Sequence, residues 1–314
     1  MPLTRRNMMQ SGGLGAVLLT AAGACSRPDQ RASNDLAELD AVETAARIKA
    51  GELSSAEAVD AAIERAKRAD KKINAIAAKT FDMARKAAAA AHGPWAGVPT
   101  FVKDLEDVSG VATGFGSRAF PGYKGEEQTP LINAFLDLGV VSLGKSTTPE
   151  FGLSATTEPI STGKTRNPWN TDHSTGGSSG GAAALVASGV VPIAHASDGG
   201  GSIRIPASCC GNVGLKVSRG RNPQARPEDA VGPISLSVHG VQTRTVRDTA
   251  SVAAALALAA GENGLAPLPL IASPVKERLR IALTTRGLGG GEPDPQVAEA
   301  TRNIAALCAE LGHH

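Results

Sequence analysis

Residues 176–206 read GGSSGGAAALVASGVVPIAHASDGGGSIRIP, in which two glycine-serine runs flank an apolar stretch. The small residues of Ala182–Ser188 predict a helix, and the apolar run Val190–Ala196 predicts a strand that leads into the second glycine run. Glycine-rich backbone allows several N–H groups to converge on one point, which is what an oxyanion-binding site requires. The composition fits equally well with two flexible loops whose serines are incidental, so these residues alone leave both interpretations open.

Helical and strand-like patterns alternate on both sides of this stretch. Apolar spacing and capping signals predict helices at Ser54–Ala66, Thr80–Ala91, Leu131–Leu138, Arg247–Ala260 and Pro295–Leu311. Short apolar runs predict strands at Thr100–Val102, Val140–Leu143 and Leu279–Leu283. Such alternation is typical of an α/β fold. The long polar, glycine-rich segment between 156 and 181 indicates a functional loop rather than a simple connection.

The 314 residues have an ordinary globular composition, with 42% hydrophobic and 20% charged side chains. This excludes disordered, collagen-like and coiled-coil proteins. The formal net charge is only +2, no basic stripe is present, and aromatic residues make up 3%, so we expect no nucleic-acid partner. The four cysteines show neither metal-ligand spacing nor a disulfide pattern, so we expect no metal site.

Residues 1–25 have the features of an export signal. Arg5 and Arg6 precede a mildly apolar run of about 13 residues, Gly12–Ala24, which is shorter than the roughly 20 residues of a membrane-spanning helix. Twin arginines favour the export route for folded proteins, and the run ends in a small-x-small cleavage site. The following Cys25 is also a candidate for lipid attachment. We therefore expect a periplasmic protein or a membrane-anchored lipoprotein. The alternative is a flexible N-terminus in which the two arginines occur by chance.

The segment Gly139–Ser146 matches the letters of a phosphate-binding loop. That loop needs a turn between its glycines and a helix directly after its lysine. Here the intervening residues are a β-type apolar run, and Pro149 blocks an immediate helix. We therefore expect no nucleotide site in this segment.

Gly176–Gly180 also matches the nucleophile elbow of α/β-hydrolases, which would make Ser178 the nucleophile. The elbow requires an apolar strand directly upstream, whereas Asn170–Ser174 is polar. His239 remains as a downstream partner for such a site, so a histidine-dependent hydrolase stays open as an alternative. We interpret the remaining candidate histidines as loop or strand residues without a catalytic role: His92, His173 and His195.

Several segments follow one another in an order that is similar to a known family. They are Gly97–Asp104 (GVPTFVKD), Gly144–Phe151 (GKSTTPEF), Arg166–Asn170 (RNPWN), Gly176–Ala182, Ser197–Ser208, Gly211–Lys216 (GNVGLK) and Thr243–Thr249 (TRTVRDT). In sequence and in order they resemble the blocks of the amidase signature family. Asp198-Gly199-Gly200 and the Cys209-Cys210 pair look most like the branch that contains the 6-aminohexanoate cyclic dimer hydrolases. We therefore assign residues 35–314 to an amidase signature domain, preceded by a linker at 26–34.

The resemblance implies a Lys-Ser-Ser catalytic triad. Ser202 would be the nucleophile, Ser178 a bridging serine that follows a cis peptide bond, and Lys103 the general base. The oxyanion hole would be formed by the backbone N–H groups of Gly199, Gly200, Gly201 and Ser202. A lysine acts as a base only when it is neutral, and burial away from carboxylates lowers its pKa. Because neighbouring side chains of a strand point to opposite faces, we interpret Asp104 as structural.

The family fold is a mixed central β-sheet flanked by helices. The family reaction is hydrolysis of a carboxylic amide through a serine acyl-enzyme, with a small-molecule amide as partner and without metal or organic cofactor. A related alternative is the cytoplasmic A-type subunit of glutamyl-tRNA(Gln) amidotransferase, which shares the triad and works with partner subunits. Family members continue well beyond the segment that matches Leu311–His313, so the resemblance implies the N-terminal two-thirds of such an enzyme. A truncated, inactive fragment is the remaining alternative.

Several residues near the two glycine runs are expected to be structural. Arg204 is better suited to pairing with Asp198 inside the fold than to binding a substrate carboxylate. Cys209 and Cys210 are interpreted as buried small residues, because vicinal cysteines rarely form an unstrained disulfide. Trp169 is expected to pack its loop.

Overall fold

The computed structural model of this protein describes residues 35–223, 230–231, 234–261, 265–266, 268–274, 276–287 and 289–314. The expected export signal and linker, at 1–25 and 26–34, lie outside the described residues. In the part of the chain that is described, no helix is long and apolar enough to cross a membrane.

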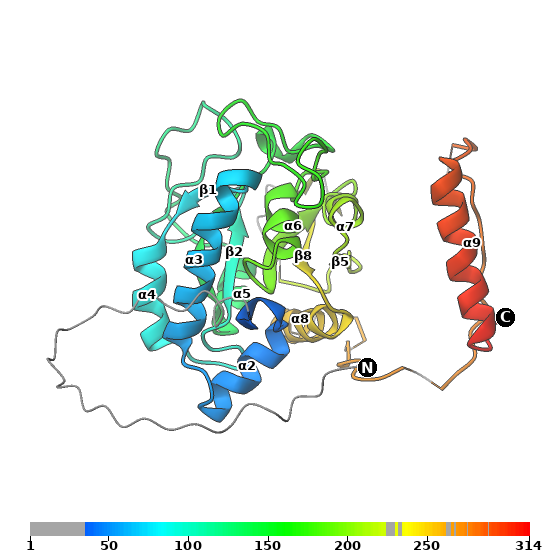
Figure 1. The fold of residues 1–314 in the computed structure, drawn as a ribbon, viewed down its shortest axis with the longest axis horizontal. Helices are drawn as coiled ribbons and strands as arrows, with labels where there is room; N and C mark the ends of the chain where they lie inside the picture. Colours follow the sequence, from blue (N-terminus) through cyan, green and yellow to red (C-terminus); the bar gives the residue numbers. More distant parts are fainter. Residues whose placement is uncertain are drawn as a thin grey trace, which may run out of the picture.

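Helices and short strands alternate along the chain, as the sequence predicts (Figure 1). The helices are α2 (Ala41–Ala50), α3 (Ser55–Ile73), α4 (Phe81–Ala90), α5 (Pro130–Asp137), the short turn η1 (Glu150–Gly152), α6 (Gly180–Ala187), α7 (Arg204–Cys210), α8 (Val246–Ala259) and α9 (Pro295–Glu310). The strands are β1 (Ile76–Lys79), β2 (Pro99–Lys103), β3 (Val141–Ser146), β4 (Ile193–Asp198), β5 (Val213–Gly214), β6 (Ala230–Val231), β7 (Ile234–Ser235) and β8 (Val238–Thr243). The α/β class is confirmed.

The strands form two three-stranded sheets, in the orders β1-β3-β2 and β4-β8-β5, together with a small pair of β6 and β7. In the first sheet β2 runs parallel to β3 while β1 runs antiparallel to it, so the strand directions are mixed as expected. The second sheet is antiparallel. Side chains join the two sheets where β2 meets β4. Thr100 Oγ1, for example, donates to the carbonyl of Ile193 over 3.0 Å.

Two apolar clusters place helices on both faces of these sheets. One cluster joins the buried side chains of α3, α4 and α6 to β3, and the other joins those of α5 and α8 to β4 and β8. Ile193 and Ala194 are adjacent in β4 but belong to different clusters, because successive side chains of a strand point to opposite faces. Helix α6 lies deep in the protein, since all of its residues from Gly180 to Val186 are buried.

Local sequence signals explain where α3 begins and ends. Ser54 Oγ accepts the N–H of Glu57 at 3.1 Å, and the Glu57 carboxylate accepts the N–H of Ser54 at 2.9 Å, which completes the predicted capping box. Asn74 follows the helix in the left-handed region, with a φ of 49°. The side chains of Val59 and Ile63, at helical spacing, are fully buried.

Strand β3 continues through Lys145 and Ser146, so no helix follows the lysine of the segment Gly139–Ser146. The Lys145 side chain is buried, and its Nζ donates to Thr113 Oγ1 over 3.0 Å and to the carbonyl of Glu106. A lysine held in this way inside the fold cannot reach a phosphate at the surface. The rejection of a phosphate-binding loop is therefore confirmed.

The predicted strand Leu279–Leu283 is wrong. The segment joins no strand among the described residues, and its backbone bonds instead run to the last residue. The N–H of His314 donates to the carbonyl of Leu279 over 2.8 Å, and the N–H of Ile281 donates to the carbonyl of His314 over 2.6 Å. Helix α9, which lies beside this segment, stands apart from the body formed by α2 to α8 (Figure 1). A short apolar run becomes a strand only where another strand is available to pair with its backbone groups.

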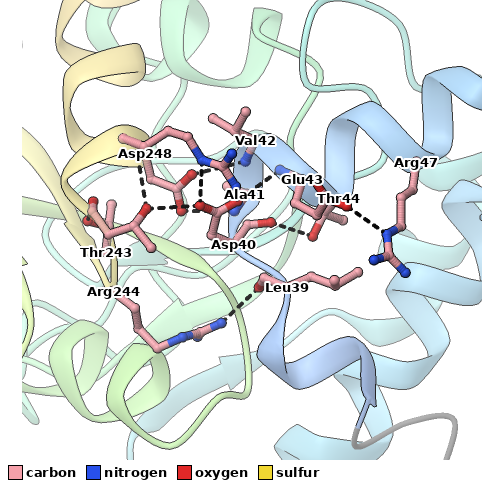
Figure 2. A network of polar contacts seen from close by, with 12 residues as sticks. Leu39, Asp40, Ala41, Val42, Glu43, Thr44, Arg47, Thr243, Arg244 and Asp248 are labelled. Carbon is pink, nitrogen blue, oxygen red and sulfur yellow. Dashed lines mark hydrogen bonds and ion pairs between the residues drawn. The ribbon is translucent and has the colours of Figure 1, made fainter. Parts of the chain in front are cut away.

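A polar network fastens the start of α2 to the start of α8 (Figure 2). The buried carboxylate of Asp248 accepts the N–H groups of Ala41 and Val42 over 2.8 and 3.0 Å. Asp40, the N-cap of α2, forms an ion pair with Arg247 at 2.7 Å. Residues that lie 207 positions apart in the chain are joined in this way.

The Asp248→Ala variant should lower the free energy of unfolding by about 2–4 kcal/mol, because each buried N–H left without an acceptor costs about 1–3 kcal/mol. Denaturant titration would measure this loss. The control is Asp60→Ala, which removes a half-exposed pair with Arg85 and should cost less than about 1 kcal/mol. Equal losses in the two variants would contradict the structural role assigned to Asp248.

Candidate active site

The predicted base, Lys103, is the last residue of β2 and is fully buried. Its Nζ lies 2.7 Å from Ser178 Oγ and 3.0 Å from Ser197 Oγ. Ser178 lies directly before Ser179, the N-cap of α6, whereas Ser197 lies in β4. The structure therefore brings together a lysine and two serine hydroxyls from three different segments of the chain.

Ser197 was not predicted as a site residue. It belongs to the strand that leads into the second glycine run, and its hydroxyl lies on the side of β4 that faces Lys103. Predicting Ser197 would have required the register of β4, because the strand pattern alone does not show which face of a strand lies against Lys103.

Burial lowers the pKa of Lys103 to about 7, although the charges of Glu106 and Asp198 oppose this shift. A substantial fraction of the amine is therefore neutral near neutral pH and able to accept a proton. The adjacent Asp104 points away from it, as predicted. Its carboxylate accepts the N–H of Gly114 at 3.1 Å and lies 3.8 Å from Lys145 Nζ.

Ser178 is 2% exposed and follows a cis peptide bond from Gly177, as the family resemblance implies. The next residue, Ser179, connects this loop to the rest of the site. Its Oγ donates to the carbonyl of Ser197 over 3.2 Å, and its N–H donates to the carbonyl of Ser202 over 3.2 Å. These bonds hold the first glycine-serine loop against β4 and against the loop that carries Ser202.

The second glycine-serine loop is braced by Asp198. Its carboxylate accepts the N–H groups of Gly201 at 2.7 Å and Ile203 at 3.1 Å, and both of its oxygens bind the guanidinium of Arg204, at 2.9 and 3.0 Å. Burial raises the pKa of Asp198, but the hydrogen bonds from Arg204 and the backbone outweigh it and bring the pKa to about 2. The predicted Asp198–Arg204 pair is confirmed.

The same contacts change the expected oxyanion hole. Of the four N–H groups that the resemblance implies, that of Gly201 already donates to the Asp198 carboxylate. Gly201 has a φ of 126°, and a Cβ at this position would lie 2.7 Å from Ile205 Cδ1, so the residue serves the turn. Gly199 and Gly200 line the open side of the loop together with Ser202.

An open cavity of about 600 Å³ lies over these loops. Its polar lining residues include Ser178, Ser197, Ser202, Ser237 and Glu106. The other walls are mainly apolar and include Leu105, Phe115, Phe151, Leu153 and Leu236. A second hollow of about 380 Å³, between α9 and residues 281–283, contains none of the predicted site residues.

His239 does not support the nucleophile-elbow alternative. It lies in β8, where its Nδ1 is 3.2 Å from Nε2 of His195, whereas Ser178 contacts Lys103. No strand leads into Gly176, although the elbow requires one. The geometry thus favours the lysine as the partner of Ser178.

The two vicinal cysteines are free thiols, and the expectation for them is only partly correct. Cys210 is buried as predicted, and burial raises its pKa to about 12. Cys209 is exposed, because α7 turns its side chain outward, and burial of part of the thiol still raises its pKa. Trp169 is also exposed, yet its Nε1 donates to the carbonyl of Cys210 over 2.7 Å and so ties its loop to α7.

No group of three or more His, Cys, Asp or Glu residues with the arrangement of a metal site occurs in the described ranges. The site as described consists of a lysine, serine hydroxyls and glycine-rich backbone. Such groups can transfer protons, attack a carbonyl carbon and stabilise an oxyanion.

Comparison with known proteins identifies the class to which this site belongs. The family model described as "Amidase" matches residues 57–314, and the chain belongs to this family. It is 47% identical over 281 residues to AmiC of Mycobacterium tuberculosis, assigned to the amidases by its name; the match covers 88% of this chain and 59% of that protein. It is 38% identical over 291 residues to the 6-aminohexanoate-cyclic-dimer hydrolase of Paenarthrobacter ureafaciens, with 87% and 58% covered.

Solved structures show the same relationship. The structure of a 6-aminohexanoate cyclic dimer hydrolase complexed with substrate is similar, with a TM-score of 0.77, 35% identity, and coverage of 89% of this chain and 60% of that chain. A bacterial aryl acylamidase of the amidase signature enzymes has a TM-score of 0.76, 32% identity, and coverage of 88% and 60%. The chain thus spans about 60% of the length of these relatives.

The burial of Lys103 should make folding stability depend on pH. The group has a pKa of about 7 in the folded chain and an ordinary value of 10.5, so between these values the unfolded chain binds more protons. Its contribution to stability therefore rises with pH across this window and is lost as the pH falls. The difference in unfolding free energy between the parent and Lys103→Met should therefore grow as the pH rises, by up to about 1.4 kcal/mol per pH unit.

Denaturant titrations of both proteins at several pH values between 7 and 10.5 would measure this difference. The exposed lysine Lys86 on α4 offers the matched substitution Lys86→Met, whose slope should be smaller. A difference for Lys103→Met that does not vary with pH would show that Lys103 stays charged inside the fold.

Proposed function

We propose that this protein hydrolyses small-molecule carboxylic amides through an acyl-enzyme on Ser202. The observation that carries the proposal is the 2.7 Å contact between Lys103 Nζ and Ser178 Oγ, beside the cavity that Ser178 and Ser202 line. A buried amine with a lowered pKa next to a serine hydroxyl is suited to remove a proton from a nucleophile. Membership of the amidase family supports the same reaction.

In the proposed first step, the neutral amine of Lys103 accepts the hydroxyl proton of Ser178 while Ser178 Oγ accepts that of Ser202. Ser202 Oγ bonds to the carbonyl carbon, and the electron pair of the C=O bond moves to oxygen. When the tetrahedral species collapses, the C–N bond breaks and the proton returns from Lys103 through Ser178 to the leaving nitrogen. Water then attacks the ester by the same path, which releases the carboxylic acid and restores Ser202.

We assign the oxyanion to the N–H groups of Gly199, Gly200 and Ser202, because that of Gly201 is occupied by Asp198. Losing one donor of such a hole typically costs about 10²–10³ in kcat. Since the pKa of Asp198 is held at about 2, its carboxylate remains ionised and keeps the loop braced at neutral pH.

The proposed substrate class is a linear or cyclic small-molecule amide. The cavity is lined by serines, glycines and the carboxylate residue Glu106, and by aromatic and aliphatic residues such as Phe115, Phe151 and Leu236. This supports an amide flanked by apolar groups. The name of the Paenarthrobacter relative refers to a cyclic dimer, which belongs to the same class. No observation favours the amidotransferase-subunit alternative.

Labelling with a fluorophosphonate separates the two candidate nucleophiles. We expect the covalent adduct on Ser202, because only this serine lies within the loop proposed to hold the oxyanion. Ser178→Ala should slow labelling of Ser202 by tenfold or more without abolishing it, since the proton relay is interrupted. Ser202→Ala should remove the adduct entirely. Peptide mass mapping identifies the modified residue.

The surface variant Ser109→Ala serves as the control and should label at the parent rate, because Ser109 is exposed and is not among the residues that line the cavity. An adduct on Ser178 would overturn the assignment and support a histidine-dependent hydrolase. The absence of any adduct in the parent would instead favour the alternative of an inactive fragment.

We also propose that the protein is exported, on the basis of Arg5, Arg6 and the short apolar run after them. Arg5→Lys combined with Arg6→Lys should leave the precursor in the cytoplasm, because the two substitutions remove the twin-arginine signal. Cell fractionation and N-terminal sequencing measure this. Arg31→Lys is the matched control and should be processed normally. Normal periplasmic recovery of the double variant would contradict the proposal.

A further inference from the structure

The two three-stranded sheets lie side by side at Lys103, the candidate base, but no backbone hydrogen bonds between described strands join them. Among the described strands, β2 pairs only with β3, and its other edge lies beside β4. Backbone groups on such an edge need partners when they are buried. Here side chains supply them. The N–H of Lys103 donates to Nδ1 of His195, in β4, over 3.3 Å, so an imidazole accepts the bond that a strand carbonyl would ordinarily accept.

This contact determines the tautomers of two buried histidines. Because a backbone N–H can only donate, Nδ1 of His195 is the acceptor and its proton is on Nε2. That Nε2–H then donates to Nδ1 of His239, 3.2 Å away, so His239 also carries its proton on Nε2. The two ring planes are inclined by only 22°. The chain of donors therefore runs from the backbone of Lys103 through His195 to His239.

Both imidazoles are held neutral. Burial lowers the pKa of His239 to about 3 and that of His195 well below its ordinary value, and the nearby amines of Lys103 and Lys145 act in the same direction on His195. Glu106 is the acidic group that faces them, with Oε1 3.9 Å from Nδ1 of His239. Protonation of His195 at Nδ1 would also place one N–H against another and break the bond to Lys103.

We propose that His195 is a positioning residue for the candidate base: it holds the backbone of Lys103 while Ser197, two residues further along β4, holds the Lys103 amine. His195 and Ser197 lie on the same face of β4. That face therefore forms hydrogen bonds with both the backbone N–H and the Nζ of Lys103. This inference rests on the proposed function for its effect on rate. The hydrogen bond between His195 and the backbone of Lys103, however, can be tested without any turnover.

Two substitutions of similar shape separate the two hydrogen bonds of His195. In His195→Asn, the amide oxygen is placed near the position of Nδ1 and can still accept the N–H of Lys103, although the bond to His239 is lost. In His195→Gln, the amide lies near the position of Nε2, so the bond to His239 is kept and the one to Lys103 is lost. His195→Leu removes both bonds.

The readout is the rate at which a fluorophosphonate labels Ser202, measured across pH. We expect His195→Asn to remain within about threefold of the parent, with the same midpoint pH. His195→Gln and His195→Leu should be slower by tenfold or more, with a midpoint shifted upward, because a loosened Lys103 regains water around its amine. His173→Asn, on an exposed loop, is the control and should match the parent.

A packing role for His195 would affect the Asn and Gln variants alike, and that outcome would overturn the inference. Thermal unfolding of each variant identifies any rate loss that comes from misfolding. A second measurement needs no variant to remain active. In protein labelled with ¹⁵N-histidine, the ring nitrogens of His195 should show a proton on Nε2 and none on Nδ1 from pH 5 to 9, with the signal assigned by its loss in His195→Asn.

A proton on Nδ1, or titration of His195 within that range, would overturn the inference. The two proposals fail in different ways. If the parent forms no adduct on Ser202, the proposed hydrolase function fails, whereas the tautomer measurement still decides the role of His195. If the adduct forms but the variants do not follow the expected order, only the role of His195 fails.

Discussion

The amino group of Lys103 is buried and, among the described residues, contacts no carboxylate; the rest of the site is arranged around this condition. The pKa of Lys103 can fall to about 7 only if nearby acids do not pair with it. Asp198 is occupied by Arg204 and by backbone N–H groups, and Asp104 by Gly114 and Lys145. Asp198 and Asp104 thus have their own partners, while the charge of Glu106 opposes the lowered pKa of Lys103, and the amine contacts serine hydroxyls.

This arrangement depends on close approach between segments. Helix α6 begins with two glycines, and a Cβ on Gly181 would lie 2.4 Å from the backbone nitrogen of Thr147. Only a residue without a side chain allows the start of α6 to approach the end of β3 so closely, and that approach carries Ser178 toward Lys103. The glycines of the first run therefore serve packing, whereas those of the second run serve the turn around Asp198 and the cavity wall.

The family relationship and the geometry support each other at different levels. Membership of the amidase family rests on a match over residues 57–314, and the fold agrees with solved relatives of which the chain spans about 60%. The geometry adds three contacts that the family name does not imply. The N–H of Gly201 donates to Asp198, Ser197 of β4 contacts the Lys103 amine, and the His195 imidazole accepts the backbone N–H of Lys103. The last two contacts come from the same strand, β4, which is why its register matters so much to the site.

Signals that act over a few residues could be predicted from the sequence. The capping box at Ser54, the Asp198–Arg204 pair and the exclusion of a phosphate-binding loop all depend on neighbours in the chain, and all are confirmed. Strand β8 and the contacts of His195 and Ser197 were decided by the tertiary structure alone, because each joins segments that lie far apart in the chain. The short apolar run Leu279–Leu283 shows the same limit, since it is typical of a strand yet pairs with no described strand. Local patterns determine which face of a segment is apolar; which segment lies opposite depends on strand register and on packing across the whole fold.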